Sequence, residues 1–412
     1  MATKAKTKRT YVWPKGHWSW PIKVTHKHGL RCGQFCFVGG QVDLDPKGKT
    51  LHPNDLHAQI DAVMAHIQTV LGQLGADLDD VCKIVMFYVN NGEVNERDAL
   101  MRVRRHFKSA VPPAMMPVPL PTLAYPGMRV EIEVIAMRGE NGERLPRTPS
   151  NPKGHWDWPF SHGVRCGEMI WVAGQMPVDA SGKVLNPGKP VEQAQINIEN
   201  VRKVLAGFGA TLDDVCRLNT FYVGHGTAED WSRAARIRGN AFKWPGPGGT
   251  GVPVPRLFPE GLTLRQEACA MLGIDGTHLP RLAVRPPDPH WDWPIPVNFQ
   301  QGVKCGNIIF VGGQISAKGV GEPVHGGDMA KQTRVCMQLI RDILASYGAK
   351  MDDIVKVNTF YKGGASYDQL HKNLSIRSAS FKDPGPTTTG IPLEALGMED
   401  IEIEIEAYAM VD

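Results

Sequence analysis

The sequence predicts an α+β fold of three tandem units, each with a mixed β-sheet packed on two helices. One motif recurs as GHWSWP, GHWDWP and PHWDWP, at 16–21, 154–159 and 289–294. After each motif comes the same series of strand-like and helix-like segments. Internal repetition of this kind is typical of chains built from copies of one supersecondary unit.

The first predicted element of each unit is a strand. The segments HGLRCGQFCFVGGQVDLD (28–45), HGVRCGEMIWVAGQMPVD (162–179) and QGVKCGNIIFVGGQISAKG (301–319) share an apolar run that ends in Gly-Gln. Such β-branched and aromatic runs favour strands, and a Gly inside one indicates a close backbone approach.

An amphipathic helix follows, and the second unit shows it best. Along AQINIENVRKVLAGFGA (194–210) the apolar residues fall on one broad face before Gly209 ends the helix. This face contains Ile196, Ile198, Val201, Val204, Leu205 and Phe208.

The rest of each unit adds two strands and a helix. LDDVCRLNTFYV (212–223) begins a strand, WSRAARIRGNAFK (231–243) a helix, and a Pro/Gly-rich loop leads to a last strand such as VEIEVIA (130–136). This order predicts a sheet with two helices on one side.

Polar, Pro-rich linkers at 138–153 and 272–289 suit domain boundaries. We therefore expect three domains, 1–140, 150–273 and 286–412.

Composition narrows the function classes. The chain has 412 residues, a net charge of +4 and 42% hydrophobic residues, as in an ordinary globular protein. The basic opening MATKAKTKRT reads as a solvated arm, so nucleic acid is an unfavoured partner. With no apolar leader or membrane span in the sequence, we expect a cytoplasmic protein. No cofactor and no metal are expected, and the eight cysteines are expected to be buried side chains rather than disulfides or zinc ligands.

The strand ending in Gly-Gln, the LDDV…FYV segment, the Pro-Gly-Pro loop and the VEIE strand resemble the RidA/YjgF/UK114 family, whose fold is chorismate mutase-like. These are small proteins that form homotrimers with ligand clefts between subunits. The resemblance covers nearly all of each repeat. Three copies in one chain thus imply an intrachain pseudo-trimer with clefts between its domains.

In that family, an Arg after the Pro of the Pro-Ala-Arg loop holds a substrate carboxylate. The first Glu of the VEIE strand helps to position water, and imines or enamines are hydrolysed to ketones and ammonia. Here no repeat has a cation at the Arg position, which falls on Met115 or Met116, Gly249 or Thr250, and Thr388 or Thr389. The Glu is retained as Glu131 and Glu404, but the second repeat has Arg265. The clefts are therefore expected to be chemically unequal.

A carboxylate clamp needs a guanidinium, so either the ligand lacks a carboxylate or another cation binds it. Arg265 is the first candidate, with surface solvation or a structural ion pair as the alternative. Arg238 and Arg377 share a helical position, where the first repeat has Val103, and are weaker candidates.

The His-Trp-x-Trp-Pro motif takes the place where the family carries an aromatic residue into the cleft. A Trp offers a rigid face to a planar ligand, and a His can move a proton near neutral pH. In an extended segment, Asp157 and Asp292 would share a face with His155 and His290, and the Trp pair would share the other. The alternative is that the motif anchors an arm by burying apolar surface.

These considerations favour a metal-independent hydrolase of carbon–nitrogen bonds, acting on a planar small molecule in clefts between domains. The alternatives are a non-catalytic metabolite-binding protein and, less favoured, an endoribonuclease. The predicted catalytic residues are His155, His290, Asp157, Asp292, Glu131 and Glu404. The predicted binding residues are His17, Trp18, Trp20, Trp156, Trp158, Trp291, Trp293, Arg265, Thr250, Thr388, Thr389, Met115, Tyr222 and Tyr361.

Overall fold

The computed structural model describes residues 7–286 and 290–412. The first six residues of the predicted arm, and 287–289 of the second linker, including the Pro of the third motif, lie outside the described residues. Among the described helices, none has the length and apolar character that a membrane crossing requires.

Three six-stranded sheets confirm the predicted α+β fold of three units. The first unit contains β1 (Arg9–Val12), β2 (Gly29–Cys32), β3 (Phe35–Gln41), α1 (Leu56–Gln73), β4 (Val81–Val89), α2 (Glu96–Arg104), β5 (Ala114–Leu120) and β6 (Val130–Met137). The second contains β7 (Arg147–Ser150), β8 (Gly163–Cys166), β9 (Met169–Gln175), α3 (Pro190–Ala206), β10 (Val215–Val223), α4 (Ala228–Asn240), β11 (Gly248–Val254) and β12 (Leu264–Met271). The third contains β13 (Arg281–Val284), β14 (Gly302–Cys305), β15 (Ile308–Ile315), α5 (Met329–Ser346), β18 (Ile354–Lys362), α6 (Asp368–Ala379), β19 (Thr387–Leu393) and β20 (Ile403–Met410), with a small hairpin of β16 (Ala317–Lys318) and β17 (Glu322–Pro323).

Each sheet is mixed in the same way. In the first unit the order is β1-β2-β3-β6-β4-β5, and β4 and β5 are parallel whereas the other neighbours are antiparallel. The linkers are not wholly irregular, because each contributes an edge strand, β7 or β13, to the next sheet. Strand β7 lies across the predicted boundary at residue 150, and the division into domains stays a prediction.

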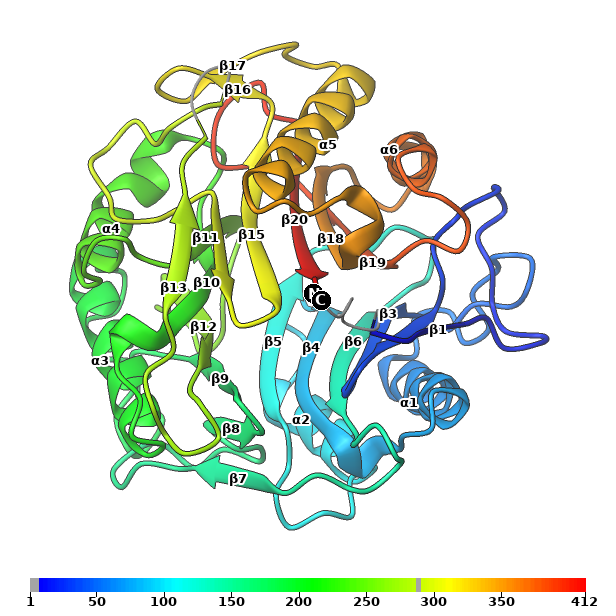
Figure 1. Ribbon diagram of the computed structural model, residues 1–412, viewed down its shortest axis with the longest axis horizontal. Coiled ribbons are helices and arrows are strands. Elements are labelled where there is room, and N and C mark those ends of the chain that lie inside the picture. The colour runs from blue at the N-terminus through cyan, green and yellow to red at the C-terminus, as the bar shows by residue number, and fades with distance from the viewer. Residues whose placement is uncertain (1–6, 287–289) are drawn as a thin grey trace, which may run out of the picture.

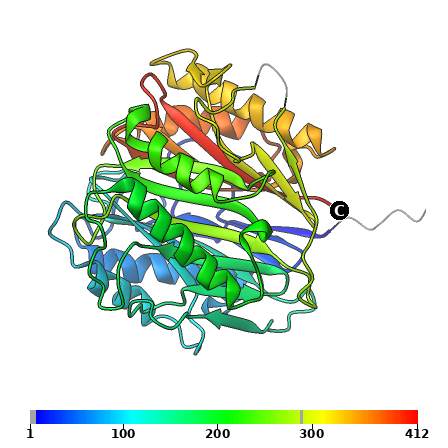
Figure 2. The same cartoon turned by 90° about the vertical axis from the view of Figure 1, so that its left-hand side faces the viewer.

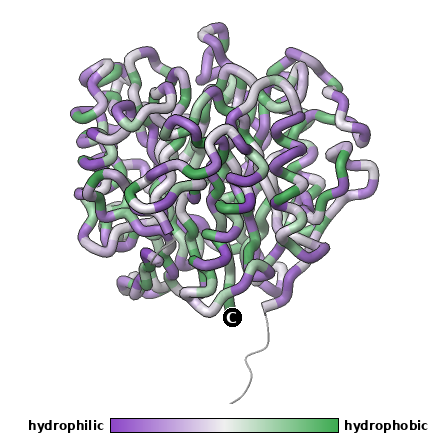
Figure 3. Tube along the Cα trace, turned by 90° about the horizontal axis from the view of Figure 1, so that it is seen from above, coloured by the Kyte–Doolittle hydropathy of each residue, from purple (hydrophilic) through white to green (hydrophobic). Residues whose placement is uncertain are grey.

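The three units surround a common centre (Figure 1), with the sheets inside and the helices outside. From the side, α3 and α4 cover the outer face of the second sheet (Figure 2). Apolar segments gather in the interior strands, whereas the outer helices alternate polar and apolar residues (Figure 3). This pattern is what burial of one helix face against a sheet requires.

Three phenylalanines meet where the units converge. The rings of Phe87, Phe221 and Phe360 are edge-on to one another, with centroids 5.9–6.3 Å apart. Because the three occupy the same position of β4, β10 and β18, they show that the units are related by an approximate threefold axis.

A ring of buried ion pairs joins the units around this axis. Lys83 contacts Glu267 at 2.5 Å and Lys356 contacts Glu133 at 2.9 Å. Arg217 pairs with Glu406 in the same way, so the cation of each unit meets the carboxylate of the next. Removing one partner of a buried pair costs about 3–5 kcal/mol, so the ring resists separation of the units.

Between neighbouring units, one edge strand packs on the first long strand of the next: β5 on β9, β11 on β15, and β19 on β3. These three contacts define the seams of the molecule, called here the first–second, second–third and third–first seams. All eight cysteines are buried and free, as predicted.

Candidate functional site

Each seam contains one side chain from the same position of β6, β12 or β20, the strand that ends its unit in the chain. Glu131 on β6, Arg265 on β12 and Glu404 on β20 lie opposite the three axial phenylalanines in the strand register. The paired glycines make room for the carboxylates: a Cβ on Gly313 would stand 1.8 Å from an oxygen of Glu404, and one on Gly40 would stand 1.9 Å from an oxygen of Glu131.

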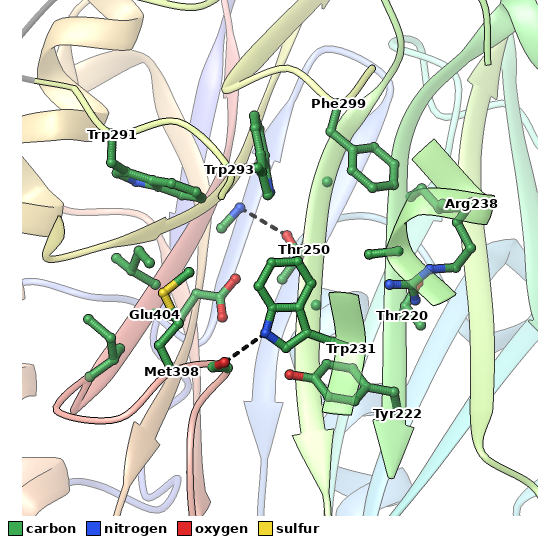
Figure 4. A pocket seen from close by; sticks show the side chains of 18 residues that line it. Thr220, Tyr222, Trp231, Arg238, Thr250, Trp291, Trp293, Phe299, Met398 and Glu404 are labelled. Carbon is green, nitrogen blue, oxygen red and sulfur yellow. Dashed lines mark hydrogen bonds between the residues drawn. The ribbon is translucent and has the colours of Figure 1, made fainter. Parts of the chain in front are cut away.

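The second–third seam contains a pocket with an empty volume of about 690 Å³, including its mouth. Its wall is mostly apolar and includes several aromatic rings, and its polar groups are few (Figure 4). The side chains that line it and bear on its chemistry are Thr220, Tyr222, Trp231, Arg238, Thr250, Trp291, Trp293, Phe299, Met398 and Glu404.

Arg238, on α4, is the cation of this pocket and is only 4% exposed. Its Nε and Nη1 make no hydrogen bond with any described residue, and its guanidinium has no carboxylate partner among them. Burial lowers the pKa of Arg238 to about 10, so the side chain is still charged at neutral pH. A buried, unpaired guanidinium is costly, so Arg238 is a candidate to bind an anionic group of a ligand.

The comparison with α6 shows how Arg238 is left unpaired. Arg377 occupies the same place, and it donates from Nε to Asn373 at 3.0 Å and from Nη1 to Thr388 at 2.7 Å. In the second unit, Ala234 stands four residues before the arginine, where the third unit has Asn373. Gly249 stands where the third unit has Thr388, because each is the strand partner of the same position of β10 or β18. Neither can accept a side-chain hydrogen bond.

Glu404 supplies the acid of the pocket. Burial, and then the nearby charge of Glu406, raise the pKa of Glu404 to about 8, so its carboxyl is mostly protonated at neutral pH. In Figure 4, Glu404 and Arg238 stand on opposite sides of the pocket. Thr250 accepts a hydrogen bond from the Gly313 backbone at 3.0 Å, so its own proton remains available to a ligand. Tyr222 completes the polar set.

The third–first seam is narrower, with an empty volume of about 370 Å³. Trp18, Trp20, Glu131, Arg377 and Thr388 line it. Burial and the charge of a neighbouring glutamate raise the pKa of Glu131 to about 8, as at the other seam. Here, however, Nε and Nη1 of Arg377 are bonded within its own unit, and Nη2 alone lacks a partner among the described residues.

Two other predicted residues of the third unit point elsewhere. Thr389 donates to Glu133 at 2.5 Å and so contacts the ring of buried ion pairs around the threefold axis. Tyr361 is fully buried in the core and does not line the narrow pocket.

The first–second seam also has a hollow, with an empty volume of about 1050 Å³ and Glu96, Trp156 and Phe258 in its lining, but its guanidinium is already paired. Arg265 contacts Glu96 of α2 at 2.9 Å and donates to the Pro117 and Phe258 carbonyls at 2.7 and 2.6 Å. Of the two alternatives for Arg265, the structure thus shows a structural ion pair rather than a guanidinium on an open cleft. Met115 is buried in the core of its own unit instead of facing a ligand.

The Trp residues of the repeated motif lie where a ligand could meet them. Trp18 and Trp20 line the narrow pocket, and Trp291 and Trp293 line the larger one. Trp156 and Trp158 line the hollow at the first–second seam, beside Asp157.

The polar residues of the motif are placed differently from the expectation. The histidine and the aspartate of a motif have different surroundings: His155 is partly buried, whereas Asp157 is exposed. Asp157 and Asp292 are exposed and pair with Arg97 and Arg285.

No histidine of the motif is among the residues that line either seam pocket. His17 donates to Gln41 at 2.8 Å, and burial lowers its pKa to about 4. Burial also lowers the pKa of His155. His290 is 7% exposed. The catalytic roles predicted for His155 and His290 remain untested.

Sequence reasoning ranked Arg238 low and missed Trp231 and Phe299. The available signal was the change of residue type at matched positions: Trp231 stands where the other units have Glu96 and Leu370. Among the described residues, no group of three or more His, Cys, Asp or Glu is arranged to hold a metal ion.

Comparisons with known proteins agree with the repeat analysis. The family model described as endoribonuclease L-PSP matches residues 22–138, 156–269 and 294–411. A RutC family protein of Pyrococcus abyssi is 31% identical over 111 residues, covering 27% of this chain and 84% of that protein. The mitochondrial protein Mmf1 of Saccharomyces cerevisiae is 28% identical over 117 residues, covering 28% of this chain and 77% of its own.

One solved structure is similar over most of the chain. A chorismatase crystal structure matches with a TM-score of 0.55 at 14% identity, covering 80% of this chain and 93% of that one. At this identity the likeness concerns the fold.

Proposed function

The chain belongs to the endoribonuclease L-PSP family, the RidA/YjgF/UK114 family that its repeats resemble, and from this premise we propose that it hydrolyses carbon–nitrogen bonds of small molecules. The substrate is an imine or enamine that carries a carboxylate, and the site is the second–third seam. One observation carries the proposal: Arg238, buried and without a partner among the described residues, stands across the pocket from Glu404, whose carboxyl is protonated at neutral pH.

Arg238 binds the substrate in this proposal. A carboxylate accepts two parallel hydrogen bonds from a guanidinium, which fixes both the position and the orientation of the ligand. The N–H groups of Arg238 at Nε and Nη1, which have no partner among the described residues, can supply such donors. In this chain the arginine on α4 therefore takes over the role that the family gives to its loop arginine.

Glu404 moves the protons. Its carboxyl donates a proton to the nitrogen of the C=N bond, which makes the carbon electrophilic, and water adds to that carbon. The carboxylate that is formed takes a proton from the added water. Glu404 then returns this proton to the nitrogen of the carbinolamine. The C–N bond breaks with release of ammonia, and the carboxylate takes the hydroxyl proton, so an imine and one water give a carbonyl compound and ammonia. A pKa near the working pH suits a group that must both give and accept a proton.

The aromatic walls contribute by excluding water. Trp231, Trp291 and Phe299 surround the polar groups, and a less polar environment strengthens the attraction between Arg238 and a carboxylate. Cleavage of RNA is less well supported, because a chain of phosphates needs several clustered cations and this pocket offers one.

The test generates an imine in situ from an amino acid with an amino-acid oxidase and catalase, and follows the rate at which the imine decays to ketone and ammonia. We expect the protein to accelerate this decay, and Glu404→Gln to lose about 10²-fold or more of the acceleration. Glu131→Gln, at the same position of the narrower seam, is the matched comparison and is expected to retain most of the activity. Ligand binding without any acceleration would instead favour the non-catalytic alternative.

A further inference from the structure

Two aromatic residues distinguish the second–third seam from the narrower one. Both pockets have a tryptophan pair from the repeated motif, but only the larger one adds Trp231 and Phe299. At the position of Trp231 the third unit has Leu370. At the position of Phe299 the first unit has His26, whose Nδ1 hydrogen-bonds to the Pro386 carbonyl at 3.0 Å.

These two rings are held in place by their surroundings. Trp231 donates from its indole nitrogen to the Gly397 carbonyl of the third unit at 2.7 Å. The ring of Phe299 packs on Gly249, where an added Cβ would stand 3.0 Å from Cγ of the ring. Gly249 therefore both frees Arg238 and leaves room for the aromatic ring. Rigid aromatic walls of this kind favour flat ligands, which can stack on them or meet their edges.

The space beside Arg238 is also enlarged. Where the third unit has Asn373 and Leu374, the second has Ala234 and Ala235. Ala235 lines the larger pocket, and Leu374 lines the smaller one. Ala235, next to one of the residues that leave the arginine unpaired, thus gives the pocket more room on that side than Leu374 does.

The charge balance limits the ligand further. At neutral pH the pocket contains one guanidinium and one mostly protonated carboxyl, so its net charge is about one positive. A single anionic group on the ligand is matched by Arg238, whereas a second would be left in an apolar wall without a counter-charge.

We propose that the second–third seam selects a flat aromatic monocarboxylate, with the carboxylate on Arg238 and the ring between the aromatic walls. This inference rests on the proposed function for the place of the site, and it adds the substrate class: the imine or enamine of an aromatic 2-oxo acid rather than of a small aliphatic one. Trp231 and Phe299 are the residues that determine this specificity.

The test measures binding, not turnover, by isothermal titration calorimetry of the full chain. The probes are indole-2-carboxylate, its neutral analogue indole-2-carboxamide, and pyruvate. We expect indole-2-carboxylate to bind at least tenfold more tightly than either of the others. Trp231→Leu, which installs the residue of the third unit, is expected to weaken it about tenfold, and Arg238→Met to abolish its binding. Arg377→Met is the matched control and is expected to leave its affinity unchanged, with melting temperatures showing that each variant is folded.

The inference is overturned if pyruvate binds as tightly as indole-2-carboxylate, or if Arg238→Met binds indole-2-carboxylate as the unmodified chain does. Failure of the proposed function looks different. If indole-2-carboxylate binds as expected but no imine is hydrolysed faster, the specificity stands and the hydrolase falls. If small aliphatic imines are hydrolysed through Glu404 while indole-2-carboxylate does not bind, the hydrolase stands and the aromatic specificity falls.

Discussion

Arg377 donates a hydrogen bond to Thr388 at 2.7 Å, at the seam between the third unit and the first. Arg238 occupies the same place at the next seam and lacks this bond, because Gly249 stands where the threonine would be. The two arginines in matched positions therefore differ in their pairing: Nε and Nη1 of Arg377 are bonded within its own unit, leaving Nη2 without a partner, whereas Nε and Nη1 of Arg238 both lack one.

Replacing Arg238 with methionine should make the protein more stable while removing its ligand binding. The change relieves a buried, unsatisfied guanidinium, which costs about 1–3 kcal/mol, and keeps most of the side-chain volume. The melting temperature is expected to rise. The same change at Arg377 breaks two hydrogen bonds and is expected to lower it. A fall in both variants would show that Arg238 is satisfied in solution and serves the fold.

Ala234→Asn should weaken ligand binding without removing the positive charge. The new amide would accept a hydrogen bond from Nε of Arg238, as Asn373 does from Arg377 at 3.0 Å. A hydrogen bond to a charged group is worth about 1.5–3 kcal/mol, so affinity for indole-2-carboxylate is expected to fall at least tenfold. Asn373→Ala, the reverse change at the other seam, should leave that affinity unchanged; a loss there would place the ligand in the narrower pocket.

Hydrolysis should decline above about pH 8. The first step needs Glu404 protonated, and its pKa of about 8 sets the pH at which half of the sites lose that proton. The declining limb appears in a profile of imine hydrolysis against pH and is expected to be absent from the residual activity of Glu404→Gln. If the rate of Glu404→Gln falls above pH 8 in the same way, the group that titrates is not Glu404.

Stability should depend on the same carboxyl. The folded state holds the proton of Glu404 up to about pH 8, whereas in the unfolded chain it is lost near pH 4.5. This stabilisation is full below pH 4.5 and is lost as the pH rises to 8, at about 1.4 kcal/mol per unit of pKa difference. Thermal unfolding of the unmodified chain and of Glu404→Gln should therefore diverge between these pH values. Equal slopes would show that the carboxyl is ionised when buried.

Glu96→Ala should destabilise the protein by about 3 kcal/mol without affecting imine hydrolysis. The change leaves Arg265 buried without a counter-charge at the first–second seam. The Arg238 pocket lies at a different seam and is expected to be unaffected. The double change Glu96→Leu with Arg265→Met, which removes both charges, is expected to recover most of the lost stability in denaturant unfolding. No recovery would mean that the packing of the glutamate, rather than its charge, matters.

The repeats were sufficient to predict the fold, because each unit carries the same strand and helix signals in the same order. They also predicted that the Trp pair of every motif would face a cleft. Each pair lines a hollow between units, and its role in binding stays a prediction. The expectation that the histidine and aspartate of the motif lie together is not met, because Asp157 is exposed and pairs with Arg97 whereas His155 is partly buried.

The pairing of side chains across seams could not be predicted from sequence. Arg265 meets Glu96 across 169 positions of chain, and nothing in the local pattern of either residue indicates the other. Likewise, Arg238 is unpaired because Ala234 and Gly249 have no side chain that accepts a hydrogen bond. This matters only because the fold places both residues beside the guanidinium.

The most direct test of the account is the number of aromatic carboxylates that one chain binds. Calorimetric titration of the full chain with indole-2-carboxylate should give one site per chain, lost in Arg238→Met and kept in Arg377→Met. Two or three equivalent sites per chain, or a single site that survives in Arg238→Met, would contradict it.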